Sequence, residues 1–160
     1  MSAPTGGTGR KLTKNPLGPS GDQVRRNITR LRKAKGWDKK ELARRVTDLG
    51  RPMPELAIGR IEAGARRVDV DDLVALAVVL GVNVSALLLP PTDYDREQCG
   101  VTGAGEVSQS VAWDWADGQR PLAYGSDPGA THLQFLMHAR PAGRRMAEMP
   151  PMSHDEKGEA

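Results

Sequence analysis

Five short stretches of helical apolar spacing, each stopped by glycine or proline, constrain the fold of residues 20–90 more than any other feature of the sequence. The stops are Gly36, Gly50, Gly64, Gly81 and the pair Pro90-Pro91. Glycine suits the left-handed position that closes a helix, and proline cannot continue one. We therefore expect an all-α unit of five helices with short connections.

Polar residues just ahead of these stretches indicate where the helices begin. Ser20 followed by Gln23, and Asp38 followed by Glu41, have the spacing of a capping box, in which side chains bond the backbone N–H groups of the first turn. The expected helices cover residues 22–35, 39–49, 54–64, 70–80 and a last turn or two after Asn83, with Asp69 as the cap of the fourth.

The composition changes on both sides of this unit. Residues 1–19 are rich in glycine, proline and basic side chains, which is typical of a disordered basic arm or a plain flexible tail. Residues 91–140 are expected to form a partly helical extension, with one helix over 107–116. Residues 133–137 fit a helix and a strand equally well, and we expect a helix. Residues 141–160 have the composition of a disordered tail.

The net charge of +3 conceals a segregation along the chain. Residues 1–89 carry 17 Lys or Arg against 9 Asp or Glu, whereas residues 90–160 carry 6 against 11. A basic half of this kind predicts a polyanionic partner.

Other counts exclude several classes of protein. Cys99 is the single cysteine, so the chain has no internal disulfide and no zinc cluster of the Cys-x-x-Cys kind. The apolar stretch 73–80 is far shorter than the roughly 20 residues that cross a membrane, and no signal peptide is evident. We expect a cytoplasmic protein without membrane association.

Several residue groups of the helical unit occur together in one known family. They are Leu31-Arg32, Gly36-Trp37, Glu41-Leu42-Ala43, Ile58 to Gly64, Asp72-Leu73, Leu76-Ala77, Leu80-Gly81-Val82 and Leu87-Leu88. From Val24 to Leu89 the chain thus resembles the Cro-repressor-type, or XRE-type, helix-turn-helix domains. The resemblance implies a lambda-repressor-like fold over residues 20–90, with the third helix as the recognition helix of a sequence-specific DNA-binding regulator.

The outward positions of that third helix are expected to read bases. They are Glu55, Leu56, Gly59 and Arg60. Arginine can donate two hydrogen bonds to guanine, a carboxylate can accept from cytosine, and an apolar side chain can contact a thymine methyl group. The alternatives are an Arg60 that lies along a phosphate and a Glu55 that only interacts with the helix dipole.

Flanking cations are expected to contact phosphates. They are Lys39, Lys40, Arg51, Arg66 and Arg67, for which the alternative is a solvated basic surface. In the family, the residue that matches Lys39 lies against the DNA backbone. The resemblance also implies that Arg32 and Glu62 form a structural ion pair between the first helix and the end of the third.

One departure from the family pattern lies between the second and third helices. The segment from Val46 to Ile58 is longer than the usual short turn allows. Either the second helix extends to Leu49 or the turn bulges outward, and both change how the third helix enters a groove.

Signals for catalysis, metal binding or a cofactor are weak. Gly103 and Gly105 are better explained by a loop before a helix than by a nucleotide-binding loop. His132, His138 and His154 share no helical face and have no suitably spaced co-ligands. We expect no catalytic residue, no metal and no cofactor. Of the two tryptophans in the extension, we expect Trp115 to be packed, whereas Trp113 is either packed or an exposed anchor.

The resulting hypothesis is a transcriptional repressor that binds double-stranded DNA, as a homodimer if it follows the usual arrangement. Residues 91–140 are the expected surface for dimerisation or for a protein partner. The alternative function is an antitoxin-like interaction module that binds DNA to regulate its own synthesis. An enzyme is disfavoured, because residues after 91 offer neither an adequate core nor a paired acid and base.

Overall fold

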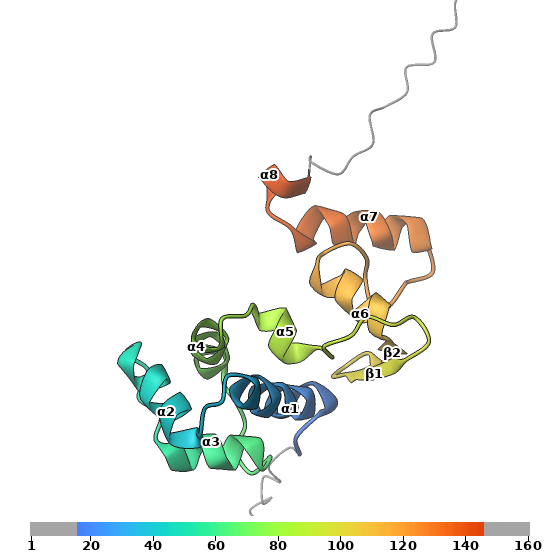
Figure 1. Ribbon diagram of the computed structural model, residues 1–160. Coiled ribbons are helices and arrows are strands. Elements are labelled where there is room, and N and C mark those ends of the chain that lie inside the picture. The colour runs from blue at the N-terminus through green and yellow to red at the C-terminus, as the bar shows by residue number, and fades with distance from the viewer. Residues whose placement is uncertain (1–15, 146–160) are drawn as a thin grey trace, which may run out of the picture.

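The computed structural model describes residues 16–145 of the 160-residue chain. These residues form two neighbouring lobes, a helical unit and a smaller C-terminal extension (Figure 1). The elements of the helical unit are α1 (Pro19–Ala34), α2 (Lys39–Asp48), α3 (Glu55–Glu62), α4 (Val70–Leu80) and α5 (Val84–Leu88). The extension contains β1 (Gln98–Val101), β2 (Gly105–Ser108), α6 (Gln109–Ala116), α7 (Pro128–Ala139) and α8 (Ala142–Arg145).

Three of the helix starts are capped by the expected side chains. Asp38, Asp69 and Asn83 each accept a hydrogen bond from the backbone N–H three residues later, at 2.7 to 2.8 Å. These caps satisfy N–H groups that have no partner within the helix. Gly36 and Gly81 have positive φ angles of 69° and 71°, as the expected stops after α1 and α4 require.

The start of α1 differs from the expected one. The helix begins at Pro19, whose missing N–H costs nothing in the first turn, and its N-cap residue Gly18 provides no side-chain bond. The expected capping box of Ser20 and Gln23 is therefore wrong. The Ser20 hydroxyl instead accepts a hydrogen bond from Thr102 N at 3.0 Å, which ties α1 to the turn of the β hairpin.

The five helices enclose one apolar core. Its fully buried members come from every helix of the unit and from the connector before α3: Ile28, Leu42, Val46, Met53, Ile58, Ile61, Leu76, Leu80 and Leu87. Burial of each such side chain contributes roughly 1.5 to 3 kcal/mol relative to exposure. The core holds α2 and α3 at a fixed mutual angle.

The long connection between α2 and α3 is ordered and anchored. Helix α2 ends at Asp48 with Leu49 as its C-cap, and the connector continues to Pro54. Met53 is buried in the core, and its backbone N–H donates to the Thr47 hydroxyl at 3.1 Å. Leu49 continues the apolar spacing of α2 but is 55% exposed, because the chain turns there and Met53 is buried instead.

The extension contains strands, so the all-α expectation is wrong for this part. Strands β1 and β2 pair antiparallel, with Val101 opposite Gly105. Gly103 and Gly105 have φ angles of 90° and 78°, which favour glycine and allow the tight turn. The expected loop before a helix is thus a hairpin, and residues 107–108 of the expected helix belong to β2.

The two tryptophans of the extension differ in their packing. Trp113 is packed in a second core cluster with Leu89, Val101 and Ala112, and its indole N–H donates to Pro90 O at 3.1 Å. Trp115 is only partly covered. Residues 133–137 are helical, as expected, within α7.

Parts of the expected arm and tail can be compared with the structure. Residues 142–145 form α8, so this part of the expected disordered tail is wrong. Residues 16–18 lead directly into α1, and Pro19 is its first residue. The rest of the arm and the tail, residues 1–15 and 146–160, lies outside the described residues.

Candidate nucleic-acid interface

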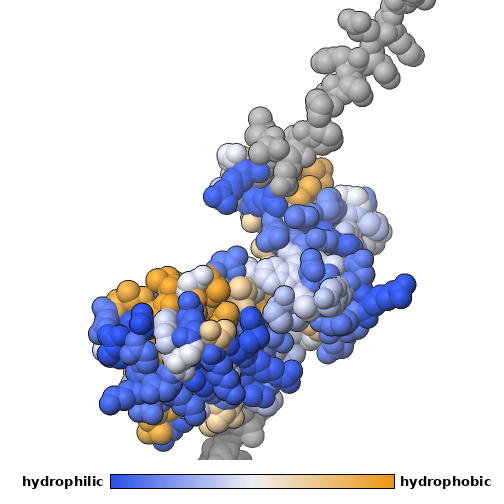
Figure 2. Space-filling model, in the orientation of Figure 1, coloured by the Kyte–Doolittle hydropathy of each residue, from blue (hydrophilic) through white to orange (hydrophobic). Residues whose placement is uncertain are grey.

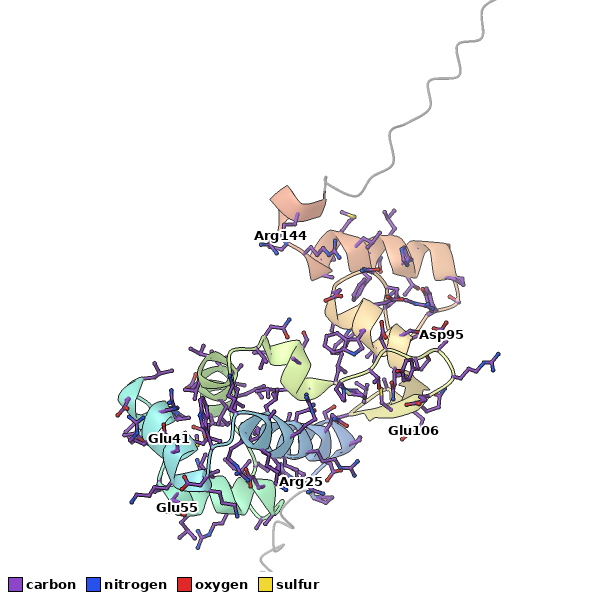
Figure 3. All side chains as sticks on the ribbon, viewed as in Figure 1. Arg25, Glu41, Glu55, Asp95, Glu106 and Arg144 are labelled. Carbon is purple, nitrogen blue, oxygen red and sulfur yellow. The ribbon has the colours of Figure 1, made fainter. Side chains whose placement is uncertain are left out.

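Helices α2 and α3 present one largely polar surface of the helical unit. Glu41 lies on α2 and Glu55 at the start of α3, on the side of the molecule away from Asp95 and Glu106 of the extension (Figure 3). Figure 2 shows that the visible face of the helical unit is mostly hydrophilic, with apolar areas at its edges. The extension therefore leaves the α2 and α3 surface uncovered.

The four residues expected to read bases share the outer side of α3. Glu55, Leu56 and Arg60 are exposed, and Leu56 leaves 64% of its surface uncovered although it is apolar. Gly59 is half-buried, and the Lys39 ammonium of α2 would lie 4.0 Å from a Cβ atom at this position. The structure thus brings the first turn of α2 against the middle of α3, so one ligand could contact both helices.

The cations expected to contact phosphates divide into two groups. Lys39 and Lys40 are exposed and have no ion-pair partner among residues 16–145, and the same holds for Arg60, which was expected to read bases. Arg67 is exposed and donates to the Pro16 carbonyl oxygen at 2.9 Å, so no carboxylate among the described residues offsets its charge. These side chains leave positive charge at the rim of the surface.

Arg51 and Arg66 form the second group and bind aspartates of α4. Arg51 Nε lies 2.7 Å from Asp72 Oδ1, and Arg66 Nη2 lies 2.8 Å from Asp72 Oδ2. Arg51 also contacts Asp69 at 3.0 Å, and the hydrogen bond to Asp72 raises the pKa of its guanidinium. Asp72 is buried, so its two arginine partners hold the connector and the loop after α3 onto α4. Phosphate contacts by Arg51 and Arg66 stay a prediction.

Arg32 and Glu62 form a bidentate ion pair. Arg32 Nε and Nη2 donate to the two Glu62 oxygens at 2.6 and 2.9 Å, with side-chain exposures of 9% and 7%. Arg32 Nη1 donates to the Trp37 carbonyl oxygen at 2.7 Å, and the hydrogen bond to Glu62 raises the pKa of the guanidinium. The pair joins the C-terminal part of α1 to the last residue of α3, so it fixes the position of the exposed helix.

Two supporting groups were not expected from the sequence. Buried Asn27 donates to the carbonyl oxygens of Leu87 and Leu89 at 3.0 and 2.7 Å, which joins α1 to the chain leaving α5. An asparagine between Val24 and Ile28 on the apolar side of α1 was the available signal.

The second group surrounds Glu41, which was expected to close a capping box. Its carboxylate instead accepts hydrogen bonds from Arg44 and from Arg45, at 2.9 and 2.7 Å. The hydrogen bond from Arg44, which has the largest effect, and that from Arg45 lower the pKa of Glu41 to about 2. Arg45 in turn lies over the Trp37 ring at 4.2 Å. Both arginines are thereby held along α2, on the flank of the helical unit.

Two other features are absent from the part of the chain that the structure describes. Residues 16–145 contain no group of three or more His, Cys, Asp or Glu side chains that could hold a metal ion. Among the same residues, no helix is long and apolar enough to cross a membrane.

An exposed helix supported by a preceding helix, with unpaired cations around it, is the arrangement typical of a helix-turn-helix DNA-binding domain. A family model described as helix-turn-helix matches residues 28–87. Residues 28–87 therefore form an XRE-type helix-turn-helix domain, the class of domain with which transcription regulators bind DNA.

The chain is also similar to one solved structure, described as a hypothetical transcription factor from Neisseria. The two are 27% identical, and the match covers 51% of this chain and 92% of the other with a TM-score of 0.41. The search of curated proteins found no match.

Proposed function

We propose that the protein is a sequence-specific repressor that places α3 in the major groove of double-stranded DNA. The observation that supports this proposal best is the joint surface of α2 and α3, where Arg60 and Leu56 are exposed beside the unpaired ammonium of Lys39. The major groove is about 12 Å wide and admits one helix, whose exposed side chains then meet base edges. Repression would follow because a bound protein blocks access to the operator.

The proposed contacts divide by chemistry. Arg60 would donate to guanine, Glu55 would accept from a cytosine amino group, and Leu56 would contact a thymine methyl group. The backbone at Gly59 would allow close approach of α3 to the groove. Lys39, Lys40 and Arg67 would contact phosphates, because their charges have no carboxylate partner among the described residues.

Arg51 and Arg66 would contact phosphates only at the outer rim. Both arginines pair with the carboxylate of Asp72, and Arg51 also pairs with Asp69. Their positive charge is thus largely offset, so they would contribute less than Lys39. The Arg32 and Glu62 pair would keep α3 in place without touching DNA.

Selection of bound sequences from random duplexes tests the proposed function. The full-length protein is expected to enrich one sequence motif, because three chemically different side chains on α3 face outward. Binding without any enriched motif would contradict sequence-specific recognition. A tight complex with a second protein that occludes α3 would favour the alternative, an antitoxin-like module that regulates its own synthesis.

The Lys39→Ala variant is expected to weaken binding to all sequences alike. A phosphate contact contributes through counterion release, so its loss should reduce the slope of log affinity against log salt by about 1. The measurement is a salt titration of binding for wild type and variant on enriched and scrambled duplexes. Arg26→Ala, in α1 at the groove between α1 and the extension, is the control and should leave the slope unchanged. A change in the enriched motif would instead assign Lys39 to base recognition.

A dimer on two half-sites would increase affinity by doubling these contacts. We include a homodimer in the proposed function, and residues 91–140 remain the proposed surface for a different protein partner. In that segment Leu133 and Met137 of α7 are exposed.

A further inference from the structure

A row of apolar side chains is exposed along α4. Val70, Val74 and Val78 recur every fourth residue, so they lie on one face of the helix, and they leave 75%, 47% and 60% of their surfaces uncovered. Leu49, at the end of α2, is exposed as well and lines a groove of about 290 Å³ together with Val78 and Val79. Figure 2 shows an apolar area along the edge of the helical unit where α4 lies in Figure 1.

Single exposed apolar residues are common on protein surfaces, but a continuous row is not. Valine is also a weaker helix former than the polar residues that ordinarily cover an exposed helix face. No role of the DNA-contacting surface requires this row, because that surface is built from α2 and α3. The row therefore indicates a contact with a partner.

Charge is distributed unequally along the row. Beside Val70, at the start of α4, lie three aspartates (Asp69, Asp71 and Asp72) and two arginines (Arg51 and Arg66). Of these aspartates, Asp71 is the most exposed, with only a 3.7 Å contact to Arg51. Beside Val78, at the other end, three cations outnumber two carboxylates: Lys35, Arg44 and Arg45 against Glu41 and Asp48. The row thus joins a net negative end to a net positive end.

We propose that the row on α4 is the interface between two copies of this chain, packed antiparallel about a two-fold axis at Val74. In this arrangement Val70 of each copy meets Val78 of the other, and Asp71 approaches the basic end of the other copy. A surface with an apolar centre and opposite charges at its ends is complementary to itself, as a two-fold interface requires. The inference deepens the proposed function, because it names the second copy of the proposed homodimer.

The expected dimer is weak in the absence of DNA. The row from Val70 to Val78 spans about 12 Å of helix. Its burial falls below the roughly 800 Å² per partner of a standard stable interface. Two adjacent half-sites would strengthen the dimer, because they raise the effective concentration of each copy for the other.

Disulfide trapping in the full chain tests the antiparallel arrangement. With Cys99→Ser as background, we expect Val74→Cys to form cross-linked dimers under mild oxidation, whereas Val70→Cys or Val78→Cys alone should form few. A mixture of the last two should cross-link efficiently. For helices 8 to 10 Å apart, facing Cα atoms at residue 74 lie about 3.4 to 5.4 Å apart, and the upper part of this range overlaps that of disulfides.

Leu133→Cys, at an exposed apolar position of α7, is the matched control for random collision. The proposal is overturned if Leu133→Cys cross-links as fast as Val74→Cys or faster. It is also overturned if Val70→Cys or Val78→Cys alone forms cross-linked dimers and Val74→Cys does not. Absence of any cross-link at the three valines also overturns it, and would fit a face covered by another part of the same chain.

A charged variant separates this inference from the proposed function. Val74→Lys is expected to abolish the dimer in sedimentation analysis and the cooperativity of binding to paired half-sites. Because residue 74 is exposed, the thermal unfolding of the protein should stay unchanged. The motif selected on one half-site should stay unchanged as well. A dimeric wild type that selects no DNA motif would contradict the proposed function but leave the interface. A Val74→Lys protein that still dimerises would contradict the interface alone.

Discussion

Glu62→Ala is expected to lower the free energy of unfolding by about 3 to 5 kcal/mol, because it leaves a buried guanidinium without its partner. The Arg32 side chain is 9% exposed, and both of its bonds to carboxylate oxygens are lost in the variant. Typical domains have only about 5 to 15 kcal/mol of stability, so this loss would be a large fraction of the total. Urea unfolding of wild type and variant measures the difference.

A surface pair in the same helical unit provides the matched control for Glu62→Ala. Asp48→Ala also removes a carboxylate from an arginine, but the Arg44 and Asp48 side chains are 55% and 58% exposed. Exposed pairs contribute at most about 1 kcal/mol, so this variant should be nearly as stable as wild type. The double variant Arg32→Met/Glu62→Met should recover part of the loss, since apolar side chains of similar volume can replace a buried ion pair.

Sequence preference should hardly change in Glu62→Ala at a temperature where the variant is folded. The pair positions α3 from its C-terminal end and lies away from the exposed Glu55 and Leu56. Unchanged stability together with an altered DNA motif would show that Glu62 takes part in recognition, contrary to this expectation.

Arg60→Ala is expected to relax preference at one base pair, at a cost of about 1 to 3 kcal/mol in discrimination. Arg60 is exposed on α3 and has no ion-pair partner among the described residues, so its removal should change stability by no more than about 0.5 kcal/mol. The measurement is selection of random duplexes with wild type and variant, followed by binding assays on single-base variants of the enriched motif.

Arg60→Lys distinguishes base recognition from a phosphate contact. Lysine keeps the charge but loses the planar fork that donates two parallel bonds to guanine, so preference at that base pair should stay relaxed. A phosphate contact would be largely restored by lysine. Uniform weakening on all sequences in Arg60→Ala, with an unchanged motif, would place Arg60 on the DNA backbone.

Much of the helical unit can be predicted from the sequence because its signals are local. Asp38, Asp69 and Asn83 bond N–H groups three residues away, so their side chains cap helices whatever the rest of the chain does. The positive φ angle of Gly81 ends α4 for an equally local reason. The choice of α3 as the helix that carries the candidates for base contacts came instead from the family resemblance, through the residues from Ile58 to Gly64.

Predictions from the sequence were wrong where residues far apart in the chain decide the contacts of a side chain. Leu49 continues the apolar spacing of α2, but Met53 occupies the core position once the connector folds back. Ser20 has the spacing of a capping residue, yet its hydroxyl bonds Thr102, far along the chain. The hairpin of β1 and β2 was missed because its short strands lie next to a helix whose apolar spacing includes Val107.

By itself the sequence determined the five helices of the domain and their approximate positions, the XRE-type pattern and the basic character of residues 1–89. Only the tertiary structure decided which cations have carboxylate partners and which apolar residues are left uncovered. Arg51 and Lys39 are both cations that precede α3 in the sequence, but Arg51 lies against Asp72, 21 residues later, whereas Lys39 lies beside Gly59. Val70, Val74 and Val78 have helical spacing like the core residues of α4, and only the packing of that helix shows that they face outward. The physical reason is that caps depend on neighbours along the chain, whereas charge pairing and burial depend on residues that meet only after folding.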